Sequence, residues 1–335
     1  MRPRKSSMKI IKTKIDGKDL EVIKGKKMMV TNSRCAVCSQ GSNVTKDGVL
    51  KKKPSKTCYS HQSLVKIAKA YSDEHPNDKI KTEGVETEKL WNIIRNKMSG
   101  ICGYDEYCWR KQDFVKRLKD VEINMYTFKP KFPEEWKKNQ YTWLNTYDIL
   151  FVMKQYEKMR NDFIFFGVIP SDCPTKITCE LSNINIKKMV GSGINKMGAV
   201  YNLDQSFESG SHWVAFYCEF NKKKAELNYF DSYGEMPNKL IKKFMLDLAH
   251  KFKKEGIEPV IIYNDKRHQY GGSECGVFSM NFLLERLNGT SMYEITKMDI
   301  LDKDMNYLRT VLYTIDTNNT SNIIKKFKKK VSIKK

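Results

Sequence analysis

Four residues in the last third of the chain combine the side chains that thiol-based cleavage of a peptide bond requires. His212 stands in GSHWVAF, Asp231 in YFDSYG, and Gln269 and Cys275 lie six residues apart in HQYGGSECGVFS. Such cleavage needs a thiolate, a base that generates it, a group that orients the base, and hydrogen-bond donors for the oxyanion. Taken alone, a residue such as His212 is as often an ordinary strand-end histidine, Asp231 is more often a turn former, and a cysteine that opens an apolar helix is most often a small core residue. The prediction of a thiol-based site therefore rests on all four residues occurring together, in this order along the chain.

Cys275 follows a glycine-rich loop and opens the apolar segment CGVFSMNFLLERL, which is typical of a helix. The unpaired N–H groups and the dipole at a helix start stabilise a thiolate and lower its pKa from about 8.5. Gln269 can supply a side-chain N–H to the oxyanion, and the backbone N–H of Cys275 a second. Gly271, Gly272 and Gly276 let the chain approach a substrate backbone without Cβ clashes.

Two segments, 212–220 and 225–233, must bring the histidine and the aspartate together. If they form an antiparallel hairpin with residues 221 and 222 as its turn, His212 lies opposite Asp231. Side chains of opposite residues share a face, with Cβ atoms about 4.5–5.5 Å apart. Asn-Lys is a weaker tight turn than Asn-Gly, and a slip of one residue would send the two side chains to opposite faces.

The hydrophobic pattern predicts an α+β domain around these segments. Apolar residues recur at helical spacing over 143–159 and 240–254, and the runs at 163–169 and 197–203 are typical of buried strands. A further strand is expected at 260–263 and a last helix at 275–287. Together they indicate a central mixed β-sheet flanked by helices. Helical spacing at 63–70 and 87–98 predicts a separate small helical region.

Several motifs resemble those of a known protease superfamily. GSHWVAF, YFDSYG and HQYGGSECGVFS resemble the catalytic signatures of the ubiquitin-like-protein proteases, which include the SUMO-specific proteases and the adenovirus protease. WLNTYD at 143–148 resembles the first conserved helix of that superfamily. YDEYCWRKQ at 104–112, FFGVIPSDC at 165–173 and MGAVYNLD before GSHWVAF resemble thiol proteases of nucleocytoplasmic large DNA viruses, of the asfarvirus polyprotein-processing type.

The resemblance implies a papain-like, SUMO-protease-like fold and a role for each site residue. It implies that His212 is the general base, Asp231 its orienting partner, Cys275 the nucleophile and Gln269 an oxyanion donor. It also implies that Trp213 helps to form a narrow tunnel that admits only glycine before the scissile bond.

The orienting position varies among the viral members of the superfamily. Asn228 or Asp265 could therefore share that role with Asp231.

The function expected from the resemblance is that of a viral cysteine endopeptidase. It would cut structural polyproteins or core precursors after Gly-Gly-like motifs during virion maturation, in the host cytoplasm and in the virion. The chemistry itself should need no cofactor. Two alternatives are a deSUMOylase or deubiquitinase that acts on host conjugates, and an inactive virion protein that binds nucleic acid.

The charge of the chain favours polyanionic partners. The 335 residues carry a formal net charge of +22, which attracts nucleic acid or acidic proteins. We expect a basic N-terminal arm and helical region at 1–111, a catalytic domain at 112–312 and a basic tail at 313–335, and DNA is a possible partner of the arm and tail. No apolar stretch reaches the roughly 18 residues that a membrane span needs.

The nine cysteines are expected to act as free thiols, metal ligands or a nucleophile rather than as a disulfide framework. Cys35 and Cys38, followed by Cys58 and His61, have the paired spacing of a tetrahedral zinc site. A structural zinc ion is thus one hypothesis for the arm. A Cys-x2-Cys pair in a chain so rich in cysteine often has no such role.

Overall fold

The computed structural model describes residues 11–15, 18–22, 34–39, 55–315 and 323. The chain divides into two compact units, one of residues 29–131 and one of residues 1–28 and 132–335. The boundary expected at residue 112 thus falls inside the first of these units. Each unit is described by itself below.

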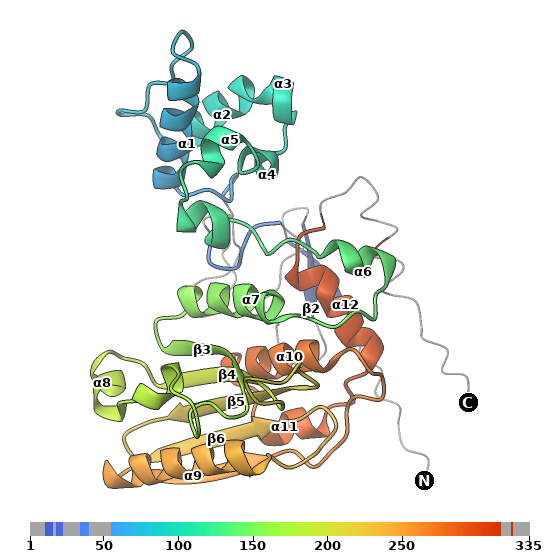
Figure 1. The fold of residues 1–335 in the computed structure, drawn as a ribbon. Coiled ribbons are helices and arrows are strands. Elements are labelled where there is room, and N and C mark those ends of the chain that lie inside the picture. The colour runs from blue at the N-terminus through green and yellow to red at the C-terminus, as the bar shows by residue number, and fades with distance from the viewer. Residues whose placement is uncertain (1–10, 16–17, 23–33, 40–54, 316–322, 324–335) are drawn as a thin grey trace. The chain divides into compact units, whose positions relative to one another are not determined.

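The unit of residues 29–131 is helical where it is described (Figure 1). Its aromatic core includes Tyr59, which stacks on Trp109 with ring centroids 5.6 Å apart and meets Phe128 edge-on at 5.3 Å. The elements are the helices α1 (His61–Glu74), α2 (Thr87–Lys97), α3 (Ser99–Cys102), α4 (Glu106–Trp109) and α5 (Asp113–Lys116), and the π-helical turn η1 (Glu122–Tyr126).

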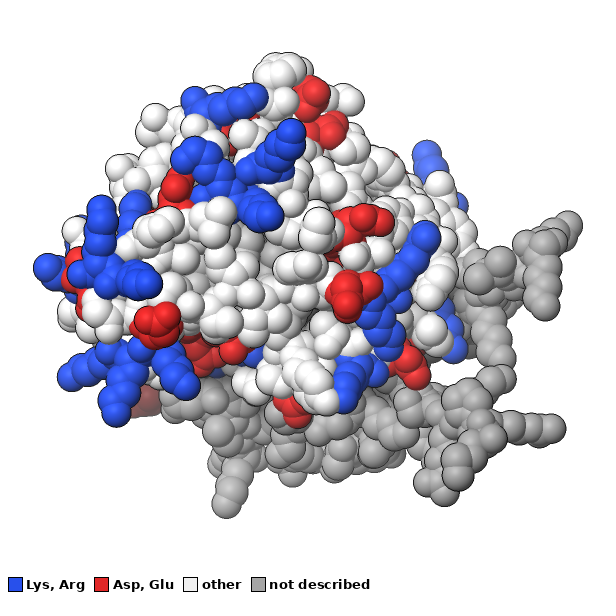
Figure 2. All heavy atoms as spheres, turned by 90° about the horizontal axis from the view of Figure 1, so that it is seen from below, with Lys and Arg blue, Asp and Glu red and all other residues white. Residues whose placement is uncertain are grey.

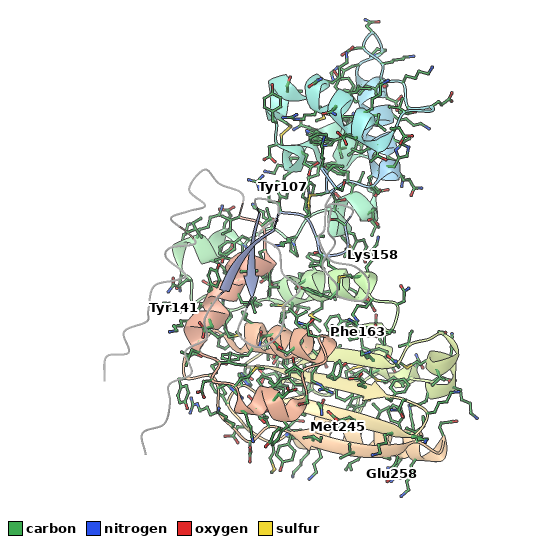
Figure 3. The ribbon with its side chains drawn as sticks, turned by 180° about the vertical axis from the view of Figure 1, so that it is seen from behind. Tyr107, Tyr141, Lys158, Phe163, Met245 and Glu258 are labelled. Carbon is green, nitrogen blue, oxygen red and sulfur yellow. A yellow bond between two sulfur atoms is a disulfide. The ribbon has the colours of Figure 1, made fainter. Side chains whose placement is uncertain are left out.

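The second unit is built on a five-stranded sheet in the order β3-β4-β5-β6-β7. The outer pairs β3–β4 and β6–β7 are parallel and the inner pairs are antiparallel, so the sheet is mixed. Figure 3 labels Phe163 and Glu258, the first residues of the two edge strands. The strands are β3 (Phe163–Pro170), β4 (Lys196–Asn202), β5 (Trp213–Phe220), β6 (Lys224–Phe230) and β7 (Glu258–Tyr263).

Helices cover both faces of this sheet (Figure 1). On one face lies α9 (Lys239–Lys254), and on the other lie α7 (Thr146–Met159) and α10 (Cys275–Leu287). The remaining elements are the short helices α6 (Glu134–Lys138), η2 (Glu180–Asn183), α8 (Ile186–Gly191) and α11 (Met292–Lys297), the helix α12 (Asp302–Leu312), and the hairpin β1 (Ile11–Ile15) and β2 (Lys18–Val22). The α+β expectation, with a central mixed sheet flanked by helices, is confirmed.

Strand alternation places a hydrophobic core between the sheet and α9. Val214 and Phe216 of β5 and Leu227 of β6 are buried there, together with Ile241 and Phe244 of α9. Figure 2 shows the outer surface on the side of α9, where lysines and arginines alternate with acidic side chains instead of forming an unbroken basic patch. The described part of this face therefore lacks the charge pattern of a dedicated polyanion surface.

The hairpin of β5 and β6 has a register two residues away from the expected one. Ala215 pairs with Phe230, so the turn is Lys222–Lys223 and not residues 221 and 222. The cause is Asn221, whose Oδ1 accepts hydrogen bonds from the N–H groups of residues 223 and 224, at 2.8 and 2.9 Å. Because side chains alternate with period two, a shift by two residues keeps every side chain on its expected face.

The helix expected from residue 143 begins at Thr146, because Asn145 caps it. Asn145 Oδ1 accepts from the Asp148 N–H at 3.0 Å, and Asp148 Oδ2 accepts from the Asn145 N–H at 2.8 Å. This reciprocal capping box satisfies two backbone donors that would otherwise lack partners at the helix start. Residues 143 and 144 therefore remain extended beside the site.

Candidate active site

His212 and Asp231 meet at one end of the sheet. His212 immediately precedes β5 and Asp231 immediately follows β6, and His212 Nε2 lies 2.7 Å from Asp231 Oδ1. Asp231 Oδ1 also accepts from the backbone N–H of Tyr233 at 2.8 Å. Both side chains are buried. The carboxylate therefore fixes the ring of His212 and leaves its Nδ1 for another partner.

That partner is Cys275, the first residue of α10. Burial by itself lowers the pKa of His212. The hydrogen bonds to Asp231 and Cys275 and the negative charges of those groups outweigh burial and raise the pKa to about 9. The imidazolium is therefore the favoured form at neutral pH. Cys275 also occupies a helix start, where backbone N–H groups have no carbonyl partner within the helix.

Asn264, after β7, holds the backbone of Asp231 in place. Its Oδ1 accepts from the Asp231 N–H at 2.8 Å, and its Nδ2 donates to the Asp231 carbonyl at 2.6 Å. The two alternatives for the orienting role lie elsewhere. Asn228 is buried within β6 and Asp265 is exposed, and neither forms a described hydrogen bond with His212. Of the three candidates for the orienting role, Asp231 is the one with a described hydrogen bond to the imidazole.

Gln269 is fully buried, and its amide is held in one orientation. Its Oε1 accepts from Ser232 Oγ at 2.6 Å, which assigns Nε2 as the donor end. Nε2 donates to the Gly271 carbonyl at 2.9 Å and makes a longer contact of 3.4 Å with Tyr233 Oη. The hydrogen of Nε2 that makes only this longer contact is the one available to an oxyanion.

Two tyrosine rings and an arginine guanidinium form a stack that packs against the ring of His212. The ring of His212 lies 4.6 Å from that of Tyr233 at an interplanar angle of 12°. On Tyr233 lies the guanidinium of Arg267, 5.0 Å from the ring centroid, and the same guanidinium lies 5.2 Å from the ring of Tyr270. Arg267 Nε also donates to the Gln269 carbonyl at 2.7 Å. The stack thus links the histidine to the glutamine loop.

Helix α12 braces the loop that carries Cys275. Asp302, at its start, accepts from the N–H of Gly271 at 2.9 Å. One turn later, Asn306 Nδ2 donates to Glu274 Oε1 at 2.7 Å, and Arg309 donates to the Ser273 carbonyl at 2.7 Å. These three side chains share one face of the helix. They hold the loop by buried polar contacts that leave it little freedom.

Trp213 is almost fully buried, next to the start of α10. Its Nε1 donates to the Leu144 carbonyl at 3.0 Å. A Cβ added to Gly276 would lie 3.1 Å from Trp213 Cδ1 and 3.3 Å from Leu144 Cβ. Glycine at position 276 therefore lets the indole pack against the turn that follows the nucleophile.

The two glycines of the loop differ in what surrounds them. A Cβ on Gly271 would lie 2.6 Å from Glu274 Oε2, so the absence of a side chain there permits the packing of the loop itself. A Cβ on Gly272 would meet no atom within 4 Å. Of the two, Gly272 is the one that leaves open space for another molecule.

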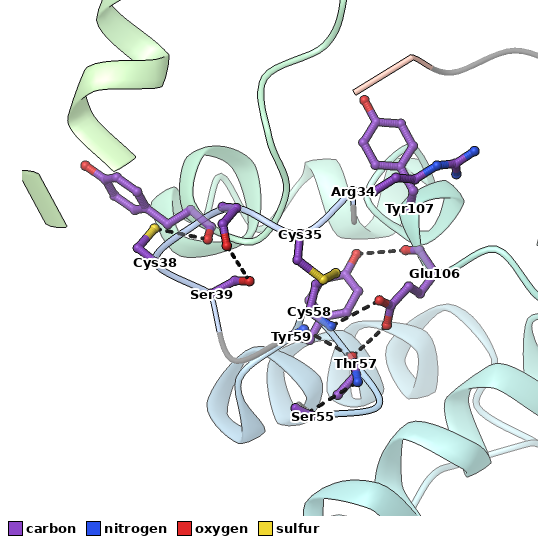
Figure 4. The surroundings of a disulfide bond; sticks show 12 residues. Arg34, Cys35, Cys38, Ser39, Ser55, Thr57, Cys58, Tyr59, Glu106 and Tyr107 are labelled. Atoms are coloured by element: carbon purple, nitrogen blue, oxygen red, sulfur yellow. Dashed lines mark hydrogen bonds between the residues drawn. A yellow bond between two sulfur atoms is a disulfide. The ribbon is translucent and has the colours of Figure 1, made fainter. Parts of the chain in front are cut away.

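The predicted zinc ligands do not come together. Cys35 and Cys58 form a disulfide (Figure 4), so neither offers a thiolate. Cys38 Sγ contacts the Tyr126 carbonyl at 3.5 Å, and His61 Nδ1 lies 3.2 Å from a threonine hydroxyl. The four residues thus do not form the expected site.

A carboxylate does lie beside the Cys35–Cys58 sulfurs. Glu106 and the two cysteines place their possible ligand atoms within 4.8 Å of one another. The carboxylate already accepts from Thr57 Oγ1 at 2.6 Å, the Cys58 N–H at 3.0 Å and Trp91 Nε1 at 3.0 Å. Its hydrogen-bonding capacity is used within the fold.

The expectation that the cysteines are unpaired is wrong for six of the nine. Besides the pair in Figure 4, the structure joins two further pairs, each separated by six residues. A spacing of six residues does not by itself indicate which thiols meet. The pairs are Cys35–Cys58, Cys102–Cys108 and Cys173–Cys179.

One prediction concerns residues that the structure describes only in part. Most of residues 1–54 and nearly all of the tail at 313–335 lie outside the described residues, so DNA binding by the basic arm and tail stays a prediction. Among the described residues, no helix combines the length and the apolar character that crossing a bilayer requires.

Known proteins resemble this chain in sequence and in fold. The profile of the Ulp1 protease family, C-terminal catalytic domain, matches residues 203–323. R355 of Acanthamoeba polyphaga mimivirus, which bears the name of a thiol protease, is 32% identical over 279 residues, covering 78% of this chain and 90% of that protein. S273R of African swine fever virus, named a SUMO-1 cysteine protease, is 30% identical over 135 residues, or 38% and 47% of the two chains.

The fold resembles a solved viral structure. The crystal structure of the African swine fever virus pS273R protease superposes with a TM-score of 0.59 and covers 87% of this chain and 98% of its own, at 18% identity. A mixed sheet with a His–Asp pair at its end and a cysteine opening the adjacent helix defines a cysteine-type peptidase. This chain belongs to the Ulp1 protease family, and the superfamily resemblance seen in its motifs is confirmed.

Proposed function

We propose that this peptidase is an endopeptidase that cuts structural polyproteins or core precursors after Gly-Gly-like motifs during virion maturation. The observation that carries the proposal is the His212 ring, which Asp231 Oδ1 holds at 2.7 Å on one nitrogen while the other faces Cys275. The names of the mimivirus and African swine fever virus relatives favour a viral setting. We place the enzyme in the host cytoplasm and the virion.

Acylation begins when Cys275 Sγ attacks the carbonyl carbon of the scissile glycine. The carbonyl π electrons move to oxygen, and the backbone N–H of Cys275 and Gln269 Nε2 are positioned to donate to the resulting oxyanion. The imidazolium of His212 then gives its proton to the leaving amine as the C–N bond breaks. A thioester on Cys275 and a free amino terminus result.

Deacylation reverses the role of the histidine. The neutral His212 takes a proton from water, and the oxygen of that water attacks the thioester carbonyl. The C–S bond breaks, the thiolate returns, and Asp231 stabilises the imidazolium that forms. The protein supplies every proton transfer, so the proposed reaction uses no metal or organic cofactor.

The packing around Cys275 supports selection for glycine. Trp213 is fixed by its bond to the Leu144 carbonyl and packs directly over Gly276. A flat, immobile aromatic wall next to the nucleophile disfavours bulky side chains on steric grounds, whereas glycine has none to exclude. This supports cleavage after glycine.

A second candidate is the removal of SUMO or ubiquitin from host conjugates. It is favoured by the name of the African swine fever virus relative, a SUMO-1 cysteine protease. Those modifiers also end in Gly-Gly, so glycine selection does not separate the two candidates. The two candidate functions differ in the part of the substrate that lies outside the Gly-Gly motif, so recognition of that part decides between them.

The test compares substrates and variants of the full chain. Peptides that contain an internal Gly-Gly should be cut after the second glycine by the wild-type protein, and a Cys275→Ala variant should not cut them. A peptide with valine in place of the second glycine is the matched substrate control. Equal rates for wild type and variant would overturn the assignment as a thiol peptidase, and faster release of SUMO from a conjugate than cleavage of a viral core precursor would favour the second candidate.

A further inference from the structure

An open pocket of about 640 Å³ adjoins the loop that carries the nucleophile. Its floor is the loop from Gly271 to Glu274, so it ends one residue before Cys275. Its walls come from the segment before α7 and from the start of α12. The apolar wall residues are Tyr141, which Figure 3 labels, and Trp143, Tyr270 and Leu301.

The walls expose large apolar side chains that the fold leaves uncovered. Tyr270 is 67% exposed and Trp143 48%. Single exposed apolar residues are common, but four that line one concavity form a continuous apolar surface of the kind that binds a ligand.

The two acids that line the pocket accept hydrogen bonds from the chain, and Lys303 is the one basic residue of its described lining. Asp302 accepts from the N–H groups of Tyr270 and Gly271, at 3.0 and 2.9 Å. The carboxylate of Glu274 accepts from the Ser273 N–H at 3.0 Å and from Asn306 Nδ2 at 2.7 Å. Both carboxylates thus already have donors within the fold. An apolar occupant that packs on the aromatic side of the pocket, away from Lys303, therefore leaves neither acid without its hydrogen bonds.

The floor is also preformed, because the three bracing side chains of α12 fix the loop. A rigid apolar site binds without the entropy cost of ordering its walls. Since the floor continues into Cys275, a polypeptide lying over the sulfur brings its neighbouring residues to the pocket. In an extended chain each residue advances about 3.3 Å and alternate side chains face the same way.

We propose that this pocket binds a large apolar or aromatic side chain of the polypeptide substrate, a few residues from the scissile glycine. The inference rests on the proposed function and adds a second specificity element to it. Glycine beside Cys275 Sγ would be required for cleavage. The apolar residue in the pocket would distinguish one glycine-containing segment from another.

The test measures binding and cleavage separately. Gly-Gly peptides carry phenylalanine at one of three positions on either side of the cut, in a background of alanine and polar residues. Affinity is measured with the Cys275→Ala protein by fluorescence polarisation, and cleavage with the protein that retains Cys275. We expect phenylalanine at one position to lower Kd and raise kcat/KM by about tenfold or more over alanine.

A substitution in the wall has a matched control. Leu301 is 44% exposed at the N-cap of α12, where serine is a favoured residue, so Leu301→Ser removes apolar wall without harming the helix. Leu246→Ser, equally exposed on α9 across the sheet, is the control. Gly272→Leu fills the cavity from its floor.

The outcomes separate this inference from the proposed function. Loss of the phenylalanine preference in Leu301→Ser and Gly272→Leu, with retention in Leu246→Ser, supports the pocket. Equal affinity for all peptides, or a preference that survives both pocket variants, overturns it. A protein that binds phenylalanine peptides preferentially yet cuts none of them keeps the pocket and refutes the proposed function.

Discussion

Replacing Asp231 by asparagine should lower the alkaline limit of activity. The asparagine keeps the shape of the side chain and an oxygen that can accept from His212 Nε2, but it removes the negative charge. In the wild-type protein the imidazolium persists until the pH rises through about 9. Activity that needs this imidazolium should therefore fall over the same range, and at a lower pH in the variant.

The size of the effect follows from the two pKa values. The difference between about 9 and the ordinary 6.5 corresponds to about 3 kcal/mol of favourable interaction with the charged ring. Asp231 and Cys275 share that interaction. A carboxylate at hydrogen-bond distance shifts the pKa of its partner by about 1 to 3 units. We therefore expect the alkaline limb of the pH–rate profile to move down by at least about one pH unit in the variant.

The assay is kcat/KM for a Gly-Gly peptide between pH 5 and 10.5, which reports the ionisation of the free enzyme. Asp265→Asn is the matched control, because Asp265 is exposed and adjoins the site without bonding to His212. An unchanged limb in Asp231→Asn, or an equal displacement in Asp265→Asn, would refute the reasoning.

The same pair affects stability with a definite sign. The pKa of His212 is raised by folding, so its contribution to the free energy of unfolding is complete below about pH 6.5 and disappears as the pH rises through about 9. Denaturant titrations should show the largest gap between wild type and Asp231→Asn at the acidic end of that range. A gap that widens toward pH 9 would contradict this linkage.

Three further predictions concern the loop, the indole and the thiols. Asn306→Leu leaves Glu274 without its 2.7 Å donor; a lost hydrogen bond to a charged group costs about 1.5–3 kcal/mol, so kcat should fall at least about tenfold, and an unchanged kcat would count against the brace. Gly276→Ala should lower kcat/KM by displacing Trp213, whereas Gly191→Ala, away from the site, should not, because its Cβ meets no atom within 4 Å. Titration of the denatured, unreduced protein should find three thiols, and nine would contradict the disulfides.

The sequence predicts that the candidate site residues come together, because each lies at the end of a strongly patterned element. His212 and Asp231 are one residue beyond paired strands, and Cys275 opens a long apolar helix. Strand pairing and helix starts are local features, so motif and periodicity locate them. The two-residue error in register did no harm, since it preserves which face each side chain occupies.

The supporting residues could not be predicted in the same way. Asn264 lies in the loop after β7, and Arg309 lies in α12. Nothing in the sequence around either residue distinguishes it from a polar residue that faces solvent. Tyr233 had a weak signal, since it lies in the YFDSYG motif itself. Its stacking on His212 depends on the turn after Asp231, which a sequence pattern does not specify.

The cysteine pairing shows the same limit. Cys35-x2-Cys38 and Cys58-x2-His61 have a spacing that fits a metal, yet spacing does not give distance between segments. The structure joins Cys35 to Cys58 and leaves His61 beside a different helix. Which sulfurs meet depends on how the segments pack in three dimensions, and the spacing of cysteines along the chain does not give that.

The most direct test of the central claim is covalent labelling by a peptide vinyl sulfone that ends in Gly-Gly, read by intact mass and peptide mapping. Cys38 is more exposed than Cys275, so exposure alone predicts a label on Cys38. A thiolate activated by His212 predicts a single adduct on Cys275, formed far more slowly in a His212→Ala variant. A label on Cys38, or labelling of Cys275 at the same rate in both proteins, would contradict the account.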